Sequence, residues 1–194
     1  IYNEAKYIDV CVQSILLQDY PKQQLEVLFV DGMSKDGTRD IVNNYSKQYP
    51  FIRLLNNEKR IVPVAMNIGI KASIGDIVMR LDAHAQYPPN YFSVLVKELV
   101  RLRADNVGVA CKTDVLNKTS KTLAIREVLS NRFGVGNSTF RLGVDKVIEV
   151  DTVPFGCWKK DVFNKYGFYD ERLIRNQDIE LNKRIVRGGG HIFI

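Results

Sequence analysis

Cysteine is scarce in this sequence, with three residues among 194, and Cys11, Cys111 and Cys157 stand far apart. No Cys-x-x-Cys pair occurs and the count is odd, which argues against a disulfide framework and against a zinc knuckle. Long hydrophobic runs are also lacking, because no uninterrupted apolar stretch approaches the roughly 20 residues that cross a bilayer. We therefore expect a soluble domain in a reducing, cytoplasmic compartment.

Three common catalytic signatures are missing as well: the P-loop, the metalloprotease helix and the Gly-x-Ser-x-Gly elbow. Acidic residues are the minority, 22 against 28 basic ones, which gives a net charge of +6 and an isoelectric point near 9.2. The lysines and arginines are scattered, so this charge favours a phosphate-bearing ligand, nucleic acid or an anionic membrane surface without choosing among them.

Helical and strand patterns alternate along the first half of the chain. Helical spacing of apolar residues begins at Ile8, and further helices are expected near 38–48, 61–72 and 92–99. Short apolar runs between them are expected as strands: "LEVLFV", "FIRLL", "GDIVMRL" and "NVGVAC". The alternation predicts an α/β fold with a mainly parallel central sheet flanked by helices on both faces. After about residue 112 longer irregular stretches follow, up to a last helix near 178–187.

Two of the predicted strands end in aspartate, and ligands of open parallel sheets bind beyond such strand ends. In "FVDGMSKDGT", Asp31 precedes the turn and is placed to accept a hydrogen bond from a ligand's ring N–H, while Asp36 or Thr38 is expected to cap the next helix. In "MRLDAHAQ", Asp82 and His84 lie on one side of an extended segment, since side chains alternate.

A carboxylate and an imidazole so placed can hold one divalent cation that bridges a diphosphate, and the imidazole shifts the preference from Mg²⁺ toward Mn²⁺. The alternative is a solvated Asp82 beside a His84 that packs on Tyr87. A third carboxylate, Asp178 in "NQDIEL", is either the N-cap of the last helix or a general base. The residues alone leave both roles open.

Five short motifs stand in order along nearly the whole chain: "YNE" at 2–4, "VDGMSKDGT" at 30–38, "AMNIGI" at 65–70, "LDAHA" at 81–85 and "NQDIELNKR" at 176–184. Together they resemble the inverting glycosyltransferases of family 2, which have the GT-A fold. The DAHA variant is similar to a branch of bacterial exopolysaccharide transferases that includes succinoglycan-type enzymes. The resemblance implies one GT-A catalytic domain over 1–194, belonging to a longer chain, with a nucleotide-sugar-binding half over 1–86 and an acceptor-binding half over 87–194.

The same resemblance implies roles for individual residues near the nucleotide. Tyr2, Glu4 and Asp31 would hold the uracil and ribose of a UDP-sugar, and Arg60 and Asn67 would lie near the nucleotide or the sugar.

The resemblance also assigns the groups at the reacting centre. Asp82 would contact the bound donor and, with His84, form the pair that binds Mn²⁺ or Mg²⁺, where the family more often has Asp-x-Asp. Asp178 would be the catalytic base, with Gln177 standing where the family has a glutamate.

The implied reaction is a metal-assisted single displacement that moves a sugar from a UDP-sugar to a hydroxyl of a saccharide or lipid-linked saccharide, without nucleic acid as a partner. This activity would belong to exopolysaccharide biosynthesis at the inner face of the cell membrane, with peripheral attachment to that membrane. A nucleotidyltransferase on a similar sheet and a non-enzymatic nucleic-acid-binding module are the alternatives, and only the glycosyltransferase predicts a UDP response that needs the metal. Donor sugar, acceptor, processivity and oligomeric state are not set by the sequence.

Overall fold

A computed structural model of the chain describes residues 1–115, 117–136 and 138–194. The helices are α1 (Ile8–Leu16), the short 3-10 helix η1 (Lys22–Gln24), α2 (Thr38–Gln48), α3 (Val62–Ala72), α4 (Tyr91–Arg101), α5 (Ser120–Leu129), α6 (Arg132–Val135), α7 (Thr139–Leu142), α8 (Asp161–Tyr166) and α9 (Gln177–Arg187). The strands are β1 (Val27–Asp31), β2 (Ile52–Asn56), β3 (Ile77–Met79), β4 (Asn106–Val107), β5 (Cys157–Lys159) and β6 (Ile192–Phe193). The predicted α/β class is confirmed, and the four predicted runs each contain a strand.

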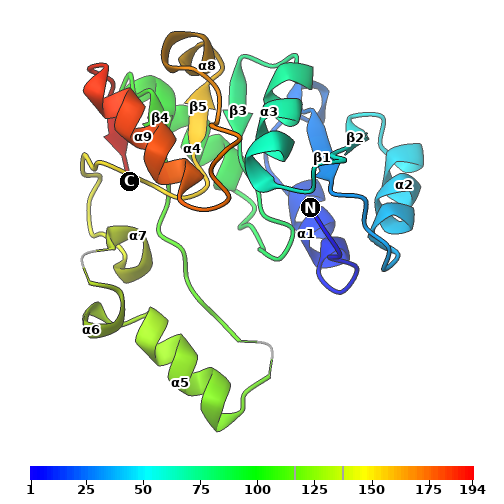
Figure 1. Ribbon diagram of the computed structural model, residues 1–194, viewed down its shortest axis with the longest axis horizontal. Coiled ribbons are helices and arrows are strands. Elements are labelled where there is room, and N and C mark those ends of the chain that lie inside the picture. The colour runs from blue at the N-terminus through cyan, green and yellow to red at the C-terminus, as the bar shows by residue number, and fades with distance from the viewer. Residues whose placement is uncertain (116, 137) are drawn as a thin grey trace.

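The strands form two groups that lie side by side in the main body (Figure 1). β1 and β2 pair in parallel, and the second group has the order β3-β5-β4-β6. In that group β4 and β6 are parallel, whereas β5 runs antiparallel to both β3 and β4. The sheet is therefore mixed, and the expectation of a mainly parallel sheet fails at β5. The physical reason is that the chain leaves the sheet over 108–156, and β5 then inserts between β3 and β4 in the opposite direction.

The helices pack on the strands through the apolar faces that the sequence pattern predicts. On α4, Phe92, Leu95 and Leu99 recur at helical spacing and are all buried. Each such side chain contributes about 1.5–3 kcal/mol when it leaves water. α2 packs on β2, α3 on β1 and α4 on β5. Trp158 of β5 and Leu181 of α9 belong to a second apolar cluster, so the last helix is fixed against the same sheet.

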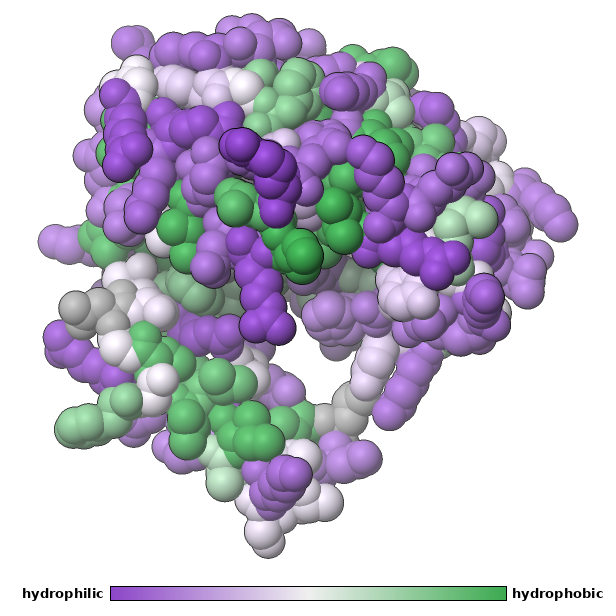
Figure 2. All heavy atoms as spheres, in the orientation of Figure 1, coloured by the Kyte–Doolittle hydropathy of each residue, from purple (hydrophilic) through white to green (hydrophobic). Residues whose placement is uncertain are grey.

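One part of the chain leaves the main body. We use "the arm" for the segment with α5, α6 and α7, which extends below the strands in Figure 1. Not one of the described residues of these three helices is buried, which explains why their apolar pattern is too weak to predict them. Figure 2 shows hydrophobic side chains gathered on the exposed surface of the arm, with hydrophilic ones at their margin. Within the described ranges no helix is both long and apolar enough to reach across a bilayer.

Candidate active site

The N-terminal motif and the turn after β1 form one surface, because four hydrogen bonds join them. The backbone N–H of Asn3 donates to Ser34 Oγ (2.8 Å), and that of Glu4 donates to Thr38 Oγ1 (2.8 Å). Two further bonds, from Ala5 N to Asp36 Oδ2 (2.9 Å) and from Lys35 N to Asn3 Oδ1 (3.0 Å), complete the set. Residues that are 31 to 34 positions apart in the sequence therefore form one loop surface.

The predicted cap of α2 is found in a modified form. Asp36 Oδ1 accepts hydrogen bonds from the N–H of Thr38 (3.1 Å) and from its hydroxyl (2.6 Å). Gly37 occupies the N-cap position itself, with φ of 94°, a left-handed conformation that suits glycine. Asp36 thus satisfies the first N–H of the helix from outside the N-cap position, and Thr38 begins the helix.

Asp31 is fully buried at the end of β1, and its carboxylate is already occupied. Ser34 donates from its hydroxyl (2.5 Å) and its backbone N–H (3.0 Å), and Arg39 Nη1 lies 2.6 Å from Oδ2. Burial raises the pKa of Asp31, but these hydrogen bonds outweigh it, so the pKa is lowered and the group stays anionic. In this arrangement Asp31 positions Ser34 and Arg39, and a ligand reaches its oxygens only if Arg39 moves.

The ring of Tyr2 lies beside Gly32, the residue that follows Asp31. A Cβ atom added to Gly32 would lie 3.2 Å from Tyr2 Cδ2, so the missing side chain of Gly32 lets the ring lie against the backbone. Tyr2 is 48% exposed, so part of its surface is accessible to a ligand.

Asp82, His84 and Glu4 converge beyond the end of β3. His84 Nε2 lies 3.8 Å from Asp82 Oδ2, and Nδ1 lies 3.2 Å from Glu4 Oε1. The His84 side chain is 59% exposed, while the Tyr87 hydroxyl accepts from the N–H of Asp82 (2.7 Å) and donates to its carbonyl (3.1 Å). His84 contacts Asp82 and Glu4 through its two ring nitrogens. Tyr87 instead fixes the backbone that carries the predicted metal pair.

This donor set fits a divalent cation in part. Two ligand atoms 3.8 Å apart can share one ion, and a carboxylate on the other imidazole nitrogen is the usual neighbour of a metal-bound histidine. No group of three or more acidic, histidine or cysteine side chains able to hold a metal occurs among the described residues. Remaining coordination positions would therefore fall to water and ligand phosphates, as is common for Mg²⁺ and Mn²⁺ sites.

Asp178 is not the N-cap of α9. That position belongs to Asn176, which has φ of 60° and makes no side-chain cap hydrogen bond, and Asp178 is the second residue of the helix. Its carboxylate is held by Arg80, whose Nη1 lies 2.7 Å from Oδ1 and 2.6 Å from Oδ2. Burial raises the pKa of Tyr169 strongly, so its hydroxyl remains protonated and donates to Asp178 Oδ1 (3.3 Å).

Arg80 is the residue at this site that the sequence interpretation missed. Its side chain is 11% exposed, its Nε lies 3.4 Å from Asp82 Oδ1, and its guanidinium lies over the ring of Phe155. Burial lowers the pKa of Arg80, but the charges of Asp178 and Asp82 outweigh it, so the pKa is raised. The signal was available in "GDIVMRLD", because a charged residue inside a buried strand pattern requires a partner.

The two remaining predicted residues lie farther from these carboxylates. Asn67 is buried in α3, where its amide donates to the Tyr169 carbonyl (2.9 Å) and Glu171 Oε1 (3.1 Å) and accepts from the Tyr169 N–H (2.9 Å). Its amide therefore braces the loop before α9. Arg60 is exposed on the turn between β2 and α3, with φ of 59°.

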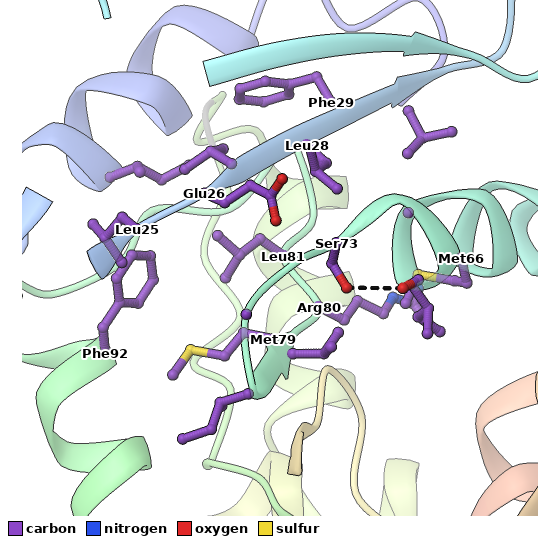
Figure 3. Close-up of a pocket in the computed structure, with 18 of the residues that line it drawn as sticks. Leu25, Glu26, Leu28, Phe29, Met66, Ser73, Met79, Arg80, Leu81 and Phe92 are labelled. Atoms are coloured by element: carbon purple, nitrogen blue, oxygen red, sulfur yellow. Dashed lines mark hydrogen bonds between the residues drawn. The ribbon is translucent and has the colours of Figure 1, made fainter. Parts of the chain in front are cut away.

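A large cavity adjoins the site but does not contain it. It occupies about 650 Å³ between β1 and β3, and its walls are mainly apolar, with Leu28, Met79 and Phe92 among them (Figure 3). Arg80 and Asp82 are among its lining residues. Apolar walls supply few donors for a diphosphate, so we place the chemistry at the polar cluster and not in the cavity.

The groups nevertheless form one connected series. Asp31 bonds Ser34, Ser34 bonds the backbone of Asn3, and the neighbouring Glu4 faces His84. From His84 the contacts continue to Asp82, then Arg80, then Asp178. The three carboxylates are therefore linked by one series of contacts, in which Asp31 itself is fully buried.

Comparison with known proteins places this geometry in a family. The sequence profile of Glycosyl transferase family 2 matches residues 1–167, a range that ends before Asp178. The chain is 30% identical to the succinoglycan biosynthesis protein ExoA of Rhizobium meliloti, with 99% of this chain and 58% of that protein covered. It is 28% identical to a dolichyl N-acetyl-alpha-D-glucosaminyl phosphate 3-beta-D-2,3-diacetamido-2,3-dideoxy-beta-D-glucuronosyltransferase of Methanococcus voltae, with coverage of 99% and 61%. The chain thus spans about three fifths of the length of these relatives.

Solved structures show the same fold. TarS of S. aureus in complex with UDP-GlcNAc superposes with a TM-score of 0.74 at 18% identity, over 99% of this chain and 53% of that one. The mannosyltransferase PcManGT of Pyrobaculum calidifontis, in complex with GDP-Man and Mn²⁺, gives 0.72 at 22% identity, over 99% and 51%. The predicted GT-A fold is confirmed, and with the profile match over most of the chain it shows that this protein belongs to glycosyl transferase family 2.

Proposed function

We propose that this domain transfers a sugar from a UDP-sugar to a hydroxyl group of a saccharide or lipid-linked saccharide, by a single displacement with inversion at the anomeric carbon. The observation that carries the proposal is the unbroken series of contacts from Asp31 through Asp82 to Asp178. Such a series spans what the reaction requires at one place: a nucleoside site, a charge-neutralising site and a base.

The donor's nucleoside would lie at the surface formed by Tyr2 and the turn after β1. The half-exposed aromatic ring of Tyr2 suits a stacked uracil, and the anionic Asp31 suits the ring N–H once Arg39 moves away. TarS, which has this fold, is known in complex with UDP-GlcNAc. Arg60, exposed on the turn before α3, would lie on the diphosphate side, whereas Asn67 would act through the loop that it braces.

A divalent cation would be held by Asp82 and His84, with Glu4 orienting the imidazole. Mn²⁺ or Mg²⁺ bound there would supply Lewis-acid charge to the diphosphate of the leaving UDP. PcManGT is known in complex with GDP-Man and Mn²⁺, which supports this choice of ion. The exposed edge of His84 keeps this position accessible to a ligand entering from solvent.

Asp178 would be the general base. One carboxylate oxygen accepts the proton of the acceptor hydroxyl while that oxygen bonds to the anomeric carbon. The bond from that carbon to the phosphate oxygen breaks at the same time, and UDP leaves with the electron pair. Attack from the face opposite to the leaving group inverts the configuration, so an α-linked donor gives a β-linked product.

The acceptor would belong to the synthesis of a cell-surface glycan at the inner face of the membrane. The name of the Methanococcus relative describes transfer to a dolichyl-linked sugar phosphate, and that of the Rhizobium relative describes succinoglycan biosynthesis. The exposed apolar side chains of the arm, Ile125, Val128 and Phe133, are suited to a lipid carrier or the membrane that holds it.

The test is a donor screen on the purified chain. UDP release would be measured with several UDP-sugars and lipid-linked saccharides, in Mn²⁺, in Mg²⁺ and in EDTA, with thermal shifts by UDP as a parallel measurement. We expect acceptor-dependent UDP release that EDTA abolishes, and a UDP-induced rise in melting temperature that needs the cation. Release of pyrophosphate from a nucleoside triphosphate would support a nucleotidyltransferase instead. Salt-sensitive binding of nucleic acid without any UDP response would support the binding module.

A further inference from the structure

Arg80 stands between the two charged parts of the proposed site. It is the first residue after β3, and its backbone N–H donates to the carbonyl of Gly156 (3.1 Å). Its guanidinium lies 5.3 Å from the ring centroid of Phe155, whose φ of 47° is unusual for a bulky residue. Backbone and side chain are thus both fixed, which is the condition for a side chain that positions another group.

The guanidinium uses different nitrogens for two carboxylates. Nη1 contacts both oxygens of Asp178, at 2.7 and 2.6 Å, while Nε lies 3.4 Å from Asp82 Oδ1. A planar guanidinium with five donors can serve two such partners at once, whereas a lysine ammonium acts as a single point charge. One cation therefore connects the proposed base on α9 with the proposed cation ligand after β3.

We propose that Arg80 is a positioning residue: it orients the Asp178 carboxylate toward the acceptor and links that orientation to the Asp82 side chain. This inference rests on the proposed function, because it takes Asp178 as the base. A merely structural role is the rival explanation. Buried ion pairs contribute little net stability, since desolvation cancels most of the attraction, so stability alone is a weak reason for this arrangement.

Charge balance distinguishes the two explanations. Arg80 Nε would compete with a bound cation for Asp82 Oδ1, and the positive charge of Arg80 would repel that cation. Removal of Arg80 therefore frees an Asp82 oxygen and makes the site more negative. Loss of Arg80 should therefore leave the affinity for Mn²⁺ unchanged or higher while transfer falls. A variant that had lost its local structure would instead lose Mn²⁺ binding and transfer together.

The experiment compares Arg80→Ala and Arg80→Lys with the wild type and with Arg184→Ala. Arg184 is a matched control, since its guanidinium pairs with Glu180 and donates to the Phe168 carbonyl (2.7 Å) instead of holding the proposed base. The readouts are kcat, KM for the donor, Mn²⁺ binding followed by electron paramagnetic resonance, and rescue by added guanidinium chloride at concentrations that leave the wild type folded.

We expect Arg80→Ala to lower kcat by about 100-fold, the cost of misplacing a reacting group, with little change in donor KM. Mn²⁺ binding should be no weaker than in the wild type, and free guanidinium should restore part of the lost rate. Arg80→Lys should still have a lowered kcat. Arg184→Ala should have a lower melting temperature, and added guanidinium should not change its rate. The inference is overturned if Arg80→Ala keeps its kcat, if guanidinium fails to rescue it, or if Mn²⁺ binding is lost with activity. A wild type without transfer would remove the proposed function before any variant is compared.

Discussion

Arg80 and Asp178, which are 98 residues apart in the sequence, meet through a guanidinium nitrogen 2.6 Å from a carboxylate oxygen. This contact joins the end of β3 to the first turn of α9. It holds the Asp178 carboxylate against Arg80, whose Nε lies 3.4 Å from Asp82 Oδ1. This contact leads to a different expectation for each carboxylate of the site.

Asp178→Asn should abolish transfer and leave UDP binding nearly intact. Asparagine keeps the size of the side chain and can still accept from Arg80, but it cannot take a proton from the acceptor hydroxyl. Loss of a general base costs between about 10² and 10⁴ in rate, and we expect kcat to fall within that range. Turnover and UDP affinity, measured together, check this. Asp170→Asn, which alters a partly exposed carboxylate paired with Arg172, is the control, and full turnover by Asp178→Asn would remove Asp178 from the mechanism.

The metal preference should change with His84. His84→Asp converts the pair into the Asp-x-Asp pattern, and because carboxylate oxygen suits Mg²⁺ better than imidazole does, the ratio of rates in Mg²⁺ and Mn²⁺ should rise. Glu4→Gln should weaken Mn²⁺ binding by about tenfold or more, since the imidazole loses its charged neighbour. Rates in each metal and Mn²⁺ titrations provide the measurements, and Glu58→Gln on an exposed turn is the control. An unchanged metal ratio in His84→Asp would show that the imidazole is not a ligand.

Asp31 should contribute stability that is lost in acid. Burial raises its pKa, but hydrogen bonds from Ser34 and Arg39 bring it below the ordinary value of 3.8. Its contribution is therefore fully present above pH 3.8 and disappears as the pH falls through the lower, folded-state pKa. Asp31→Asn should cost about 2 kcal/mol at neutral pH, from lost charged hydrogen bonds, and should flatten the acid dependence.

Urea unfolding at neutral and acid pH measures this effect. The exposed Asp40→Asn in the first turn of α2 provides the control, which should differ from the wild type only by the roughly 0.3–1 kcal/mol that a negative charge contributes at a helix N-terminus. The free energy of unfolding of Asp31→Asn and that of the wild type should converge in acid. A difference that stays constant from neutral pH to below the folded-state pKa of Asp31 would contradict the stabilising role of this carboxylate.

The sequence predicted most of the local structure and about half of the site's geometry. Helix α2 begins and ends where its pattern indicated, and β1 ends at Asp31, because these elements bury regular apolar faces. Such local rules suffice where neighbours in the sequence are also neighbours in space. Asp82 and His84 do lie close together, but the expected extended segment is wrong: Ala83 and His84 form a turn, in which the Ala85 N–H donates to the Asp82 carbonyl (3.2 Å).

Long-range partners were beyond those rules. Arg39 over Asp31 and the Tyr169 backbone on Asn67 depend on how loops fold back, which no period reveals. Strand β5 was missed because its two buried residues, Cys157 and Trp158, are too short a run to show alternation. Arg80 was passed over although a charged residue directly after an apolar run requires a partner, so this miss was one of interpretation and not of signal.

The arm should bind anionic membranes. Ile125, Val128 and Phe133 are 48%, 54% and 103% exposed. Over 120–142 the charged residues are mainly basic: Lys121, Arg126, Arg132 and Arg141 against Glu127. Apolar side chains beside lysine and arginine are typical of surfaces that insert shallowly among anionic lipid headgroups, with each basic residue contributing about 1 kcal/mol near the surface.

Sedimentation with vesicles tests this expectation. The wild type should sediment with vesicles that contain phosphatidylglycerol, less with pure phosphatidylcholine, and less again as salt screens the charge. The triple variant Ile125→Ser, Val128→Ser, Phe133→Ser should stay in the supernatant while UDP binding is kept, because these side chains lie on the arm and not among the donor-site residues. Leu17→Ser with Ile74→Ser, which alters exposed apolar residues of the main body, should sediment like the wild type. If the triple variant sediments like the wild type, the arm faces something other than lipid. The same follows if the wild type is a dimer that the triple substitution dissociates.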